Sequence, residues 1–215
     1  MASAAFVRGS CVCARPGALG AAMMRILILY GTTDGHTATI ARRLASMLET
    51  RGAESDPIDA AEAKPLPSWY DAVIVAASVH TGAYQPEVRQ WVHEHSPALA
   101  DMPTAFIPVC LGVLQPDPAV QKEVKATIDR FLTSTGWRPT AIKSVAGALL
   151  YTRYGWLKRR LMRRIARKAG GGTDTSRDYE YTDWKDLERF ATRFAALVSS
   201  RVSPRAATSQ HAQSA

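Results

Sequence analysis

Cysteine and long hydrophobic runs are both scarce in this sequence of 215 residues. The three cysteines, Cys11, Cys13 and Cys110, cannot form a disulfide framework, and the Cys11-x-Cys13 pair lacks the second pair of ligands that a zinc site needs. Their scarcity favours a reducing compartment. No run of about 18 apolar residues occurs, so we expect no membrane-spanning helix. The five histidines show no metal-binding spacing, and we expect no metal site.

Acidic residues are missing from one long stretch of the chain. The sequence contains 27 Lys and Arg against 19 Asp and Glu, a net charge of +8, but residues 130–173 contain eleven basic residues and no acidic one. Outside this stretch, 16 basic residues stand against 19 acidic ones. The chain is therefore a mildly acidic domain with one strongly basic segment. Such a segment indicates an anionic partner, which could be a membrane surface, an acidic small molecule or nucleic acid.

Both ends of the chain differ in composition from the centre. Residues 1–23 are rich in Ala and Gly and contain no acidic residue. We interpret them as a leader that is disordered or not native, with an organelle-targeting presequence over residues 1–24 as the alternative. Residues 201–215 lack an apolar period, which predicts a disordered tail. The folded domain is expected over residues 24–200, with a basic insertion near the last strand at about residues 151–175.

The rest of the chain alternates between strand and helix patterns. Apolar runs, one of them weaker, predict buried parallel strands at residues 25–30, 54–58, 71–77, 104–110 and 141–150. Amphipathic patterns predict helices at about residues 35–51, 85–94, 119–133 and from 182 onward. This order predicts a three-layer α/β fold, a doubly wound, five-stranded parallel sheet with helices on both faces. In such sheets, ligands bind at the carboxyl ends of the strands.

The loop after the first strand has the composition of an anion-binding site. It reads Gly-Thr-Thr-Asp-Gly-His-Thr over residues 31–37 and leads into the first helix. The glycines allow a tight turn whose N–H groups converge on an anion, and the helix dipole favours negative charge there. No Lys follows the second glycine and no Gly-x-Gly-x-x-Gly motif occurs, which excludes a triphosphate loop and disfavours a dinucleotide. The pattern suits one monophosphate ester; an ordinary turn with a capping Thr is the alternative.

This loop resembles the Thr-x-Thr-Gly-x-Thr phosphate signature of flavodoxins, with Asp34 where Thr is usual. We interpret Asp34 as bracing the turn through backbone N–H groups. The later motifs are similar to those of the menaquinone-dependent protoporphyrinogen IX dehydrogenases, FMN enzymes of haem biosynthesis. They read Gly147-Ala148-Leu149, Tyr151-x-Arg153-Tyr154, Gly171-Gly172-Thr173-Asp174-Thr175 and Tyr181-Thr182-Asp183-Trp184. The resemblance covers about Met24 to Val198 and implies a flavodoxin-like fold.

The resemblance also implies that three loops bind FMN. The phosphate would lie in the loop after the first strand. The loops after the third and fourth strands would hold the isoalloxazine ring, with Tyr84 or His80 near its face. The candidate cofactor-binding residues are Thr32, Thr33, Asp34, Gly35, His36, Thr37, Ser78, Val79, His80, Thr81, Gly82, Tyr84, Leu111 and Gly112. The last of these loops lacks the Tyr that many flavodoxins stack on the flavin, so a flat substrate could stack there.

Residues 154–169 form a basic amphipathic pattern. Leu157, Leu161 and Ile165 recur every four residues, and seven charges from Lys158 to Lys168 cover the remaining surface. With aromatic residues at its start, the pattern is typical of a helix that lies on an anionic membrane. A solvated helix packed on the domain is the alternative, and nucleic acid is disfavoured because no nucleic-acid-binding fold accompanies the patch. We expect peripheral attachment to the cytoplasmic side of the inner membrane, or a mitochondrial location if the leader is a presequence.

The resemblance predicts FMN-dependent oxidation of protoporphyrinogen IX to protoporphyrin IX, with menaquinone or ubiquinone as the electron acceptor. A basic, aromatic segment suits a large apolar substrate that carries propionates, and Arg153, Lys158 and Arg159 are candidate propionate contacts, although no spacing singles them out. No catalytic residue is predicted, because the cofactor performs the electron chemistry. Two alternatives share the fold: an NAD(P)H:quinone reductase, which needs no cationic helix, and an electron-carrier flavodoxin, which is usually acidic.

Overall fold

The computed structural model describes residues 23–63, 65–66, 68–153, 155–168 and 172–211. Within these ranges, the side chains of residues 157–158, 161–162, 165, 168 and 203–211 are not described. The leader expected over residues 1–23 lies outside the described part, apart from its last residue.

A five-stranded parallel sheet forms the centre of the fold. Its strands are β1 (Met24–Gly31), β2 (Ala53–Asp59), β3 (Ala72–Ser78), β4 (Thr104–Val109) and β5 (Ala141–Ile142). Their order across the sheet is β2-β1-β3-β4-β5. All six residues of β4 are buried, as expected for a central strand that is covered on both faces. The prediction of a doubly wound α/β fold is confirmed.

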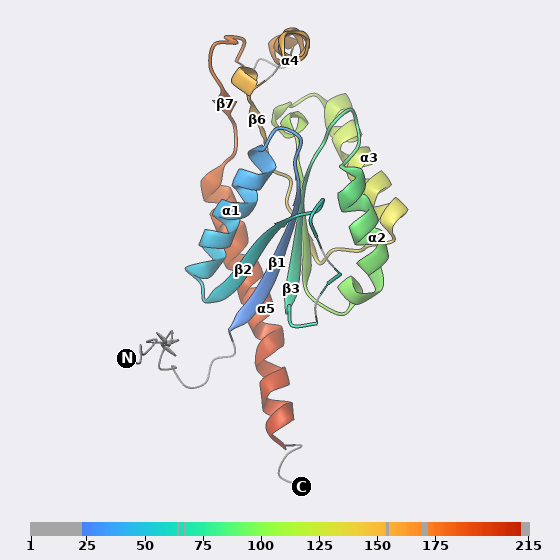
Figure 1. Cartoon of the computed structure of the whole chain (residues 1–215), viewed down its shortest axis with the longest axis vertical. Coiled ribbons are helices and arrows are strands. Elements are labelled where there is room, and N and C mark those ends of the chain that lie inside the picture. Colours follow the sequence, from blue (N-terminus) through green and yellow to red (C-terminus); the bar gives the residue numbers. More distant parts are fainter. Residues whose placement is uncertain (1–22, 64, 67, 154, 169–171, 212–215) are drawn as a thin grey trace, which may run out of the picture.

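Two pairs of helices cover the two faces of the sheet (Figure 1). The helices of the first pair are α1 (His36–Glu49) and α5 (Trp184–His211), and those of the second are α2 (Pro86–Ala100) and α3 (Pro118–Thr135). Side chains of β1 alternate between the two faces: Ile26 and Ile28 pack with α1 and α5, whereas Leu27 and Leu29 pack with α2 and α3. Burial of these apolar side chains on both faces stabilises the sheet.

The fifth strand is shorter than the sequence predicts. The apolar pattern over residues 141–150 predicts one strand, but β5 pairs with β4 over only two residues. The chain stays beside β4 as far as Val145, which bridges Val109, and then forms β6 (Ala148–Leu149), which pairs antiparallel with β7 (Tyr179–Glu180). The strand is divided because its second half pairs with a later part of the chain, as the bond from Tyr181 N to Gly147 O also shows.

Residues 148–180 form an inserted module. Its elements are β6, the 3-10 helix η2 (Tyr151–Arg153), α4 (Trp156–Lys168) and β7. The module has a small core of its own, made of the buried residues Leu149, Tyr151 and Ala166, and Leu111 from the loop after β4 packs on this core. In Figure 1, α4 lies at the top, beyond the carboxyl ends of the strands. The module is therefore joined to the domain at the edge where ligands are expected.

The last helix, α5, extends beyond the body of the domain (Figure 1). Its last buried side chain among those described is Val198, but its backbone stays helical to His211, over much of the tail for which the composition predicts disorder. Residues 212–215 lie outside the described part. Among the helices of the described ranges, none combines the length and the hydropathy that crossing a bilayer requires.

Candidate functional site

Three loops begin side by side at the carboxyl edge of the sheet. The strand register pairs Gly31, at the end of β1, with Ala77 of β3. It also pairs Ser78, at the end of β3, with Val109, at the end of β4. These three strands therefore end at the same level, which is where a parallel sheet of this kind binds ligands.

The loop after β1 is shaped to bind an anion. Gly35 is the N-cap of α1 and has a φ of +90°, a left-handed conformation that favours glycine. Its N–H donates to Thr32 Oγ1 at 2.9 Å, which holds the turn. No side chain caps the N-terminus of α1, and Thr37 in its first turn is buried. The N–H groups of this turn and the positive end of the helix dipole therefore point to the place where an anion would bind.

Gln85, which no sequence pattern singles out, links two of the loops. Its Nε2 atom donates to Ser78 Oγ at 2.8 Å and to Thr33 Oγ1 at 3.2 Å, so one side chain joins the loop after β1 to the end of β3. Gly31 permits this close approach, because a Cβ there would lie 2.9 Å from Gln85 Oε1 and 2.4 Å from Val88 Cγ2. The sequence carries no local signal for this role, because Thr33 lies 52 residues before Gln85.

The loop after β3 is a tight hairpin. Thr81 and Gly82 have positive φ angles of 49° and 80°, and His80 and Ala83 exchange both backbone hydrogen bonds, which is the geometry of a type I′ turn. Val79 N–H donates to the last carbonyl of β4, so the N–H groups of Val79 and His80 are both engaged within the protein. The exposed residues at the tip, from His80 to Gly82, are the ones that the loop can present to a ligand.

The loop after β4 is braced by α3 and by the inserted module. It forms the 3-10 helix η1 (Leu111–Leu114). Gly112 O accepts hydrogen bonds from Gln115 N at 3.1 Å and from Gln121 Nε2 of α3 at 3.0 Å. Leu111 packs on the core of the module. The module and the three loops are thus parts of one packed edge.

Comparison with known proteins assigns the chain to a family. A family described as "Flavodoxin domain" matches residues 27–176. A curated protein of Escherichia coli (strain K12) named "Protoporphyrinogen IX dehydrogenase (quinone)" is 36% identical over 177 residues, which are 81% of this chain and 97% of that protein. The chain belongs to the protoporphyrinogen IX dehydrogenase (quinone) family of flavodoxin-domain proteins. A member of the same name from Leishmania major is 35% identical over 80% of this chain and 75% of its own length.

Solved flavodoxin structures are similar to this chain at low sequence identity. A short-chain flavodoxin associated with a non-canonical PDU bacterial microcompartment superposes with a TM-score of 0.50, at 13% identity, over 82% of this chain and 99% of that protein. An oxidised flavodoxin 1 from Bacillus cereus has a TM-score of 0.49, at 14% identity, over 80% of this chain and 97% of that protein. The predicted flavodoxin-like fold is confirmed, and FMN is the cofactor of a flavodoxin domain.

The loops of this dehydrogenase family member fit FMN. The uncapped start of α1 can hold the phosphate, and the turn stabilised by Thr32 keeps its N–H groups together. The hairpin tip at Thr81 and Gly82 and the η1 residues Leu111 and Gly112 can border the isoalloxazine ring. The N–H groups of Val79 and His80 already donate within the protein, so the hairpin would contact the ring through its tip.

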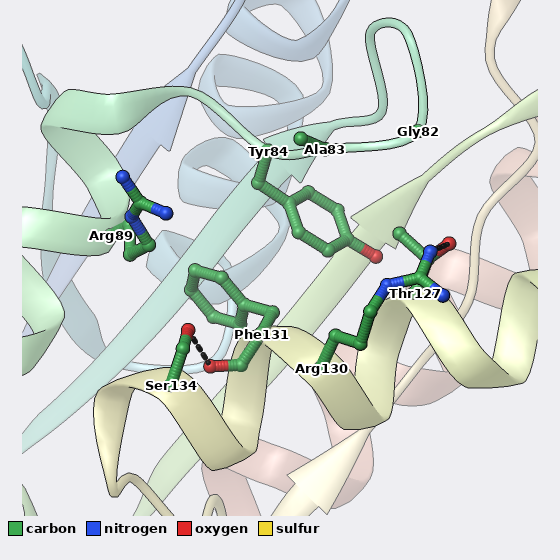
Figure 2. Close-up of a pocket in the computed structure, with 8 residues that line it drawn as sticks. All are labelled: Gly82, Ala83, Tyr84, Arg89, Thr127, Arg130, Phe131 and Ser134. Atoms are coloured by element: carbon green, nitrogen blue, oxygen red, sulfur yellow. Dashed lines mark hydrogen bonds between the residues drawn. The ribbon is translucent and has the colours of Figure 1, made fainter.

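The Tyr84 ring points into the core (Figure 2). It packs edge-on against Phe106 and Phe131, at centroid distances of 5.2 and 5.0 Å, and burial raises the pKa of its phenol. Residues of this loop, α2 and α3 line a pocket of about 250 Å³ around Tyr84 and Phe131. Residues of the loops after β1 and β4 do not line it. Tyr84 is thus a core residue, and of the two aromatic candidates for the flavin face only His80 is exposed.

His36 connects the loop after β1 to the end of β7 and the residues that follow it. Its Nε2 atom lies 2.9 Å from Thr182 Oγ1 and 4.0 Å from a carboxylate oxygen of Glu180. The Thr182 hydroxyl donates to Ala146 O, so it accepts from His36, which makes Nε2 the protonated nitrogen. Burial lowers the pKa of His36, against the opposite effect of Glu180. The imidazole is therefore neutral at neutral pH and brings no charge to the phosphate loop.

The three candidate propionate contacts occupy different places. Arg153 reaches the phosphate loop, where its Nη1 donates to Asp34 O at 3.2 Å. Arg159 Nε donates to Tyr151 O at 3.0 Å, within the module. The side chain of Lys158 lies outside the described part. Four other arginines of α4 are exposed: Arg160, Arg163, Arg164 and Arg167. Across the described residues, no cluster of His, Cys, Asp and Glu could hold a metal ion.

Proposed function

We propose that this chain oxidises protoporphyrinogen IX to protoporphyrin IX and passes the electrons to a quinone. The observation that carries this proposal is the 36% identity, over 81% of the chain, to a protein named for that reaction. Bound FMN supplies the redox chemistry, which moves electrons in pairs from the porphyrinogen to the quinone. In each round the porphyrinogen loses two electrons and two protons, and one quinone becomes a quinol.

The residues that flank the flavin loops suit a large, apolar and anionic substrate. Leu114 of η1 is 50% exposed and Trp156 at the start of α4 is 77% exposed, so each presents an apolar surface to an incoming ring. The exposed arginines of α4 carry the positive charges that propionates prefer. Arg153 is directed to the loop after β1 and Arg159 to Tyr151 within the module, so these exposed arginines are better placed for the propionates.

Anaerobic mixing tests the proposed reaction. Holoprotein is given protoporphyrinogen IX without oxygen, while flavin absorbance and porphyrin fluorescence are recorded before and after a quinone is added. We expect the flavin absorbance to bleach, porphyrin to appear, and the quinone to restore the oxidised flavin spectrum. If NADPH bleaches the flavin rapidly and the porphyrinogen never does, the chain is an NAD(P)H:quinone reductase instead.

We also propose that α4 attaches the protein to an anionic membrane, where quinones reside. Four exposed arginines and the exposed Trp156 lie on this one helix. Each basic residue near an anionic leaflet contributes about 1 kcal/mol, so their sum supports reversible binding. Because part of the attraction is electrostatic, binding should weaken as salt concentration rises.

Liposome sedimentation tests the membrane proposal. The variant changes four exposed arginines of α4 to Gln and leaves Arg159, whose Nε bonds within the module: Arg160, Arg163, Arg164 and Arg167. A control variant removes four exposed charges elsewhere, also to Gln: Arg42, Lys122, Lys125 and Arg193. We expect only the α4 variant to lose binding to anionic liposomes, while both keep FMN. Equal binding by the two variants would mean that α4 is only a solvated surface.

A further inference from the structure

Arg153 crosses from the inserted module to the phosphate loop. Its Nη1 atom donates to Asp34 O at 3.2 Å, although the two residues lie 119 positions apart. The guanidinium lies against Gly35, where a Cβ would come within 2.8 Å of Nη1. Because Gly35 is the N-cap of α1, the guanidinium stands beside the N–H groups that can bind an anion.

The turn that carries Arg153 is firmly held. Arg153 ends η2, and its N–H donates to Leu150 O at 2.9 Å. The preceding Thr152 donates to the Asp178 carboxylate through its N–H, at 2.9 Å, and through its hydroxyl, at 2.8 Å. Tyr151, the first residue of η2, is fully buried. Arg153 therefore projects from an anchored backbone, which reduces the entropy lost when its side chain binds a ligand.

The phosphate loop has no positive side chain of its own. Residues 31–37 contain one carboxylate, that of Asp34, and the neutral imidazole of His36. A phosphate at the start of α1 would therefore meet partial positive charges, but no full positive charge, from this loop. Arg153 adds a full positive charge at this place. A guanidinium has five N–H donors, and the bond to Asp34 O uses one of them, so others can be directed to a phosphate oxygen.

We propose that Arg153 is a phosphate-binding residue that the inserted module supplies to the FMN site. The FMN phosphate then holds the module against the start of α1, so cofactor binding and docking of the module support each other. This inference depends on FMN as the cofactor and not on which substrate is oxidised. It gives Arg153 a role at the cofactor in place of the propionate contact that the sequence suggests.

Riboflavin tests this role because it carries the flavin ring without the phosphate. Apoprotein is titrated with FMN and with riboflavin, and quenching of flavin fluorescence gives both dissociation constants. Loss of a charge-assisted hydrogen bond in Arg153→Gln should weaken FMN binding about tenfold to a hundredfold, and riboflavin binding less than about twofold. Arg153→Lys should recover part of the FMN affinity, because it restores the charge without the planar guanidinium.

Arg138→Gln is the matched control. It removes the same charge from an exposed residue that precedes β5, at the opposite edge of the sheet, and should leave both constants unchanged. Equal weakening of FMN and riboflavin by Arg153→Gln would mean that Arg153 only braces the Asp34 carbonyl. Unchanged FMN affinity would also overturn the proposal. If Arg153→Gln does not fold, Arg153→Lys keeps the test, since it too should lose affinity for FMN and not for riboflavin.

Docking of the module has a readout of its own. Trypsin cleaves after exposed arginines such as those of α4, so its cleavage rate reports how firmly the module is held. At equal saturation, FMN should slow this cleavage more than riboflavin does, and Arg153→Gln should remove the difference. Equal protection of the wild-type protein by the two flavins would overturn the coupling between the phosphate and the module.

Discussion

Replacing Gly35 by alanine tests the shape of the phosphate loop. At a φ of +90° an alanine is strained by about 1–2 kcal/mol. In a protein of this size each kcal/mol lowers the Tm by about 2–4 °C, so we expect a fall of about 2–8 °C. The new Cβ would also lie 2.8 Å from Arg153 Nη1. Because this atom ends a flexible side chain, the guanidinium should move away, and FMN should bind at least about tenfold more weakly.

Gly52→Ala separates backbone strain from the clash with Arg153. Gly52 has a similar φ of +81°, and a Cβ there would meet nothing within 4 Å. Thermal unfolding of the two apoproteins by circular dichroism should therefore show similar losses, while flavin titration should show weaker FMN binding for Gly35→Ala alone. Since Gly35→Ala and Arg153→Gln disturb the same guanidinium, the double variant should bind FMN scarcely more weakly than either single variant.

Two results would refute this reasoning. If Gly35→Ala loses stability as Gly52→Ala does but keeps the FMN affinity of the wild type, the close approach of Arg153 to Gly35 has no part in phosphate binding. If Gly52→Ala loses FMN affinity as well, the affinity responds to backbone strain in general and not to the geometry of this loop.

Three further substitutions have expected outcomes. Thr32→Glu removes the hydroxyl that accepts from Gly35 N and adds a second carboxylate, so the protein should purify without flavin absorbance; a wild-type flavin content would contradict the assignment of this loop. Burial lowers the pKa of His36, so as the pH drops below 6.5 the unfolded state binds a proton before the folded state does, and the free energy of unfolding should fall. Urea denaturation at several pH values should show this fall in the wild type and not in His36→Gln. A hydrogen bond from Lys143 lowers the pKa of Asp186, so this pair should stabilise the protein above the ordinary value of 3.8 and cease to do so as the pH falls through the lower, folded-state value. Asp186→Asn should therefore destabilise the protein at neutral pH and have little effect once the pH is below the folded-state pKa of Asp186. Equal destabilisation above and below that pKa would contradict the assignment.

Local patterns were sufficient to predict the central strands and the turn that leads from β1 into α1. The apolar runs at residues 25–30, 71–77 and 104–110 end within one residue of β1, β3 and β4. The basic pattern at residues 154–169 coincides with α4. Each of these features depends on the order of neighbouring residues, because apolar alternation and helix periodicity extend over only a few positions.

Two features show what local sequence patterns cannot predict. The run at residues 141–150 has the composition of one strand, but its second half pairs with β7, which lies about thirty residues later. Tyr84 stands among residues that can border the flavin, yet its ring packs edge-on against Phe106 and Phe131 in the core. In both cases a distant partner offers burial or backbone pairing that the local sequence does not reveal.

Several contacts that join the separate parts of the site link distant residues. Gln85 bonds to a threonine 52 positions away, Arg153 to a carbonyl 119 positions away, and His36 to a hydroxyl 146 positions away. The sequence alone determined which segments form strands and helices and where the tight turn before α1 lies, because these depend on residues that are adjacent in the chain. Only the tertiary structure decided that the basic module reaches the phosphate loop. That meeting depends on the path that the chain takes around the edge of the sheet, which no short window of sequence contains.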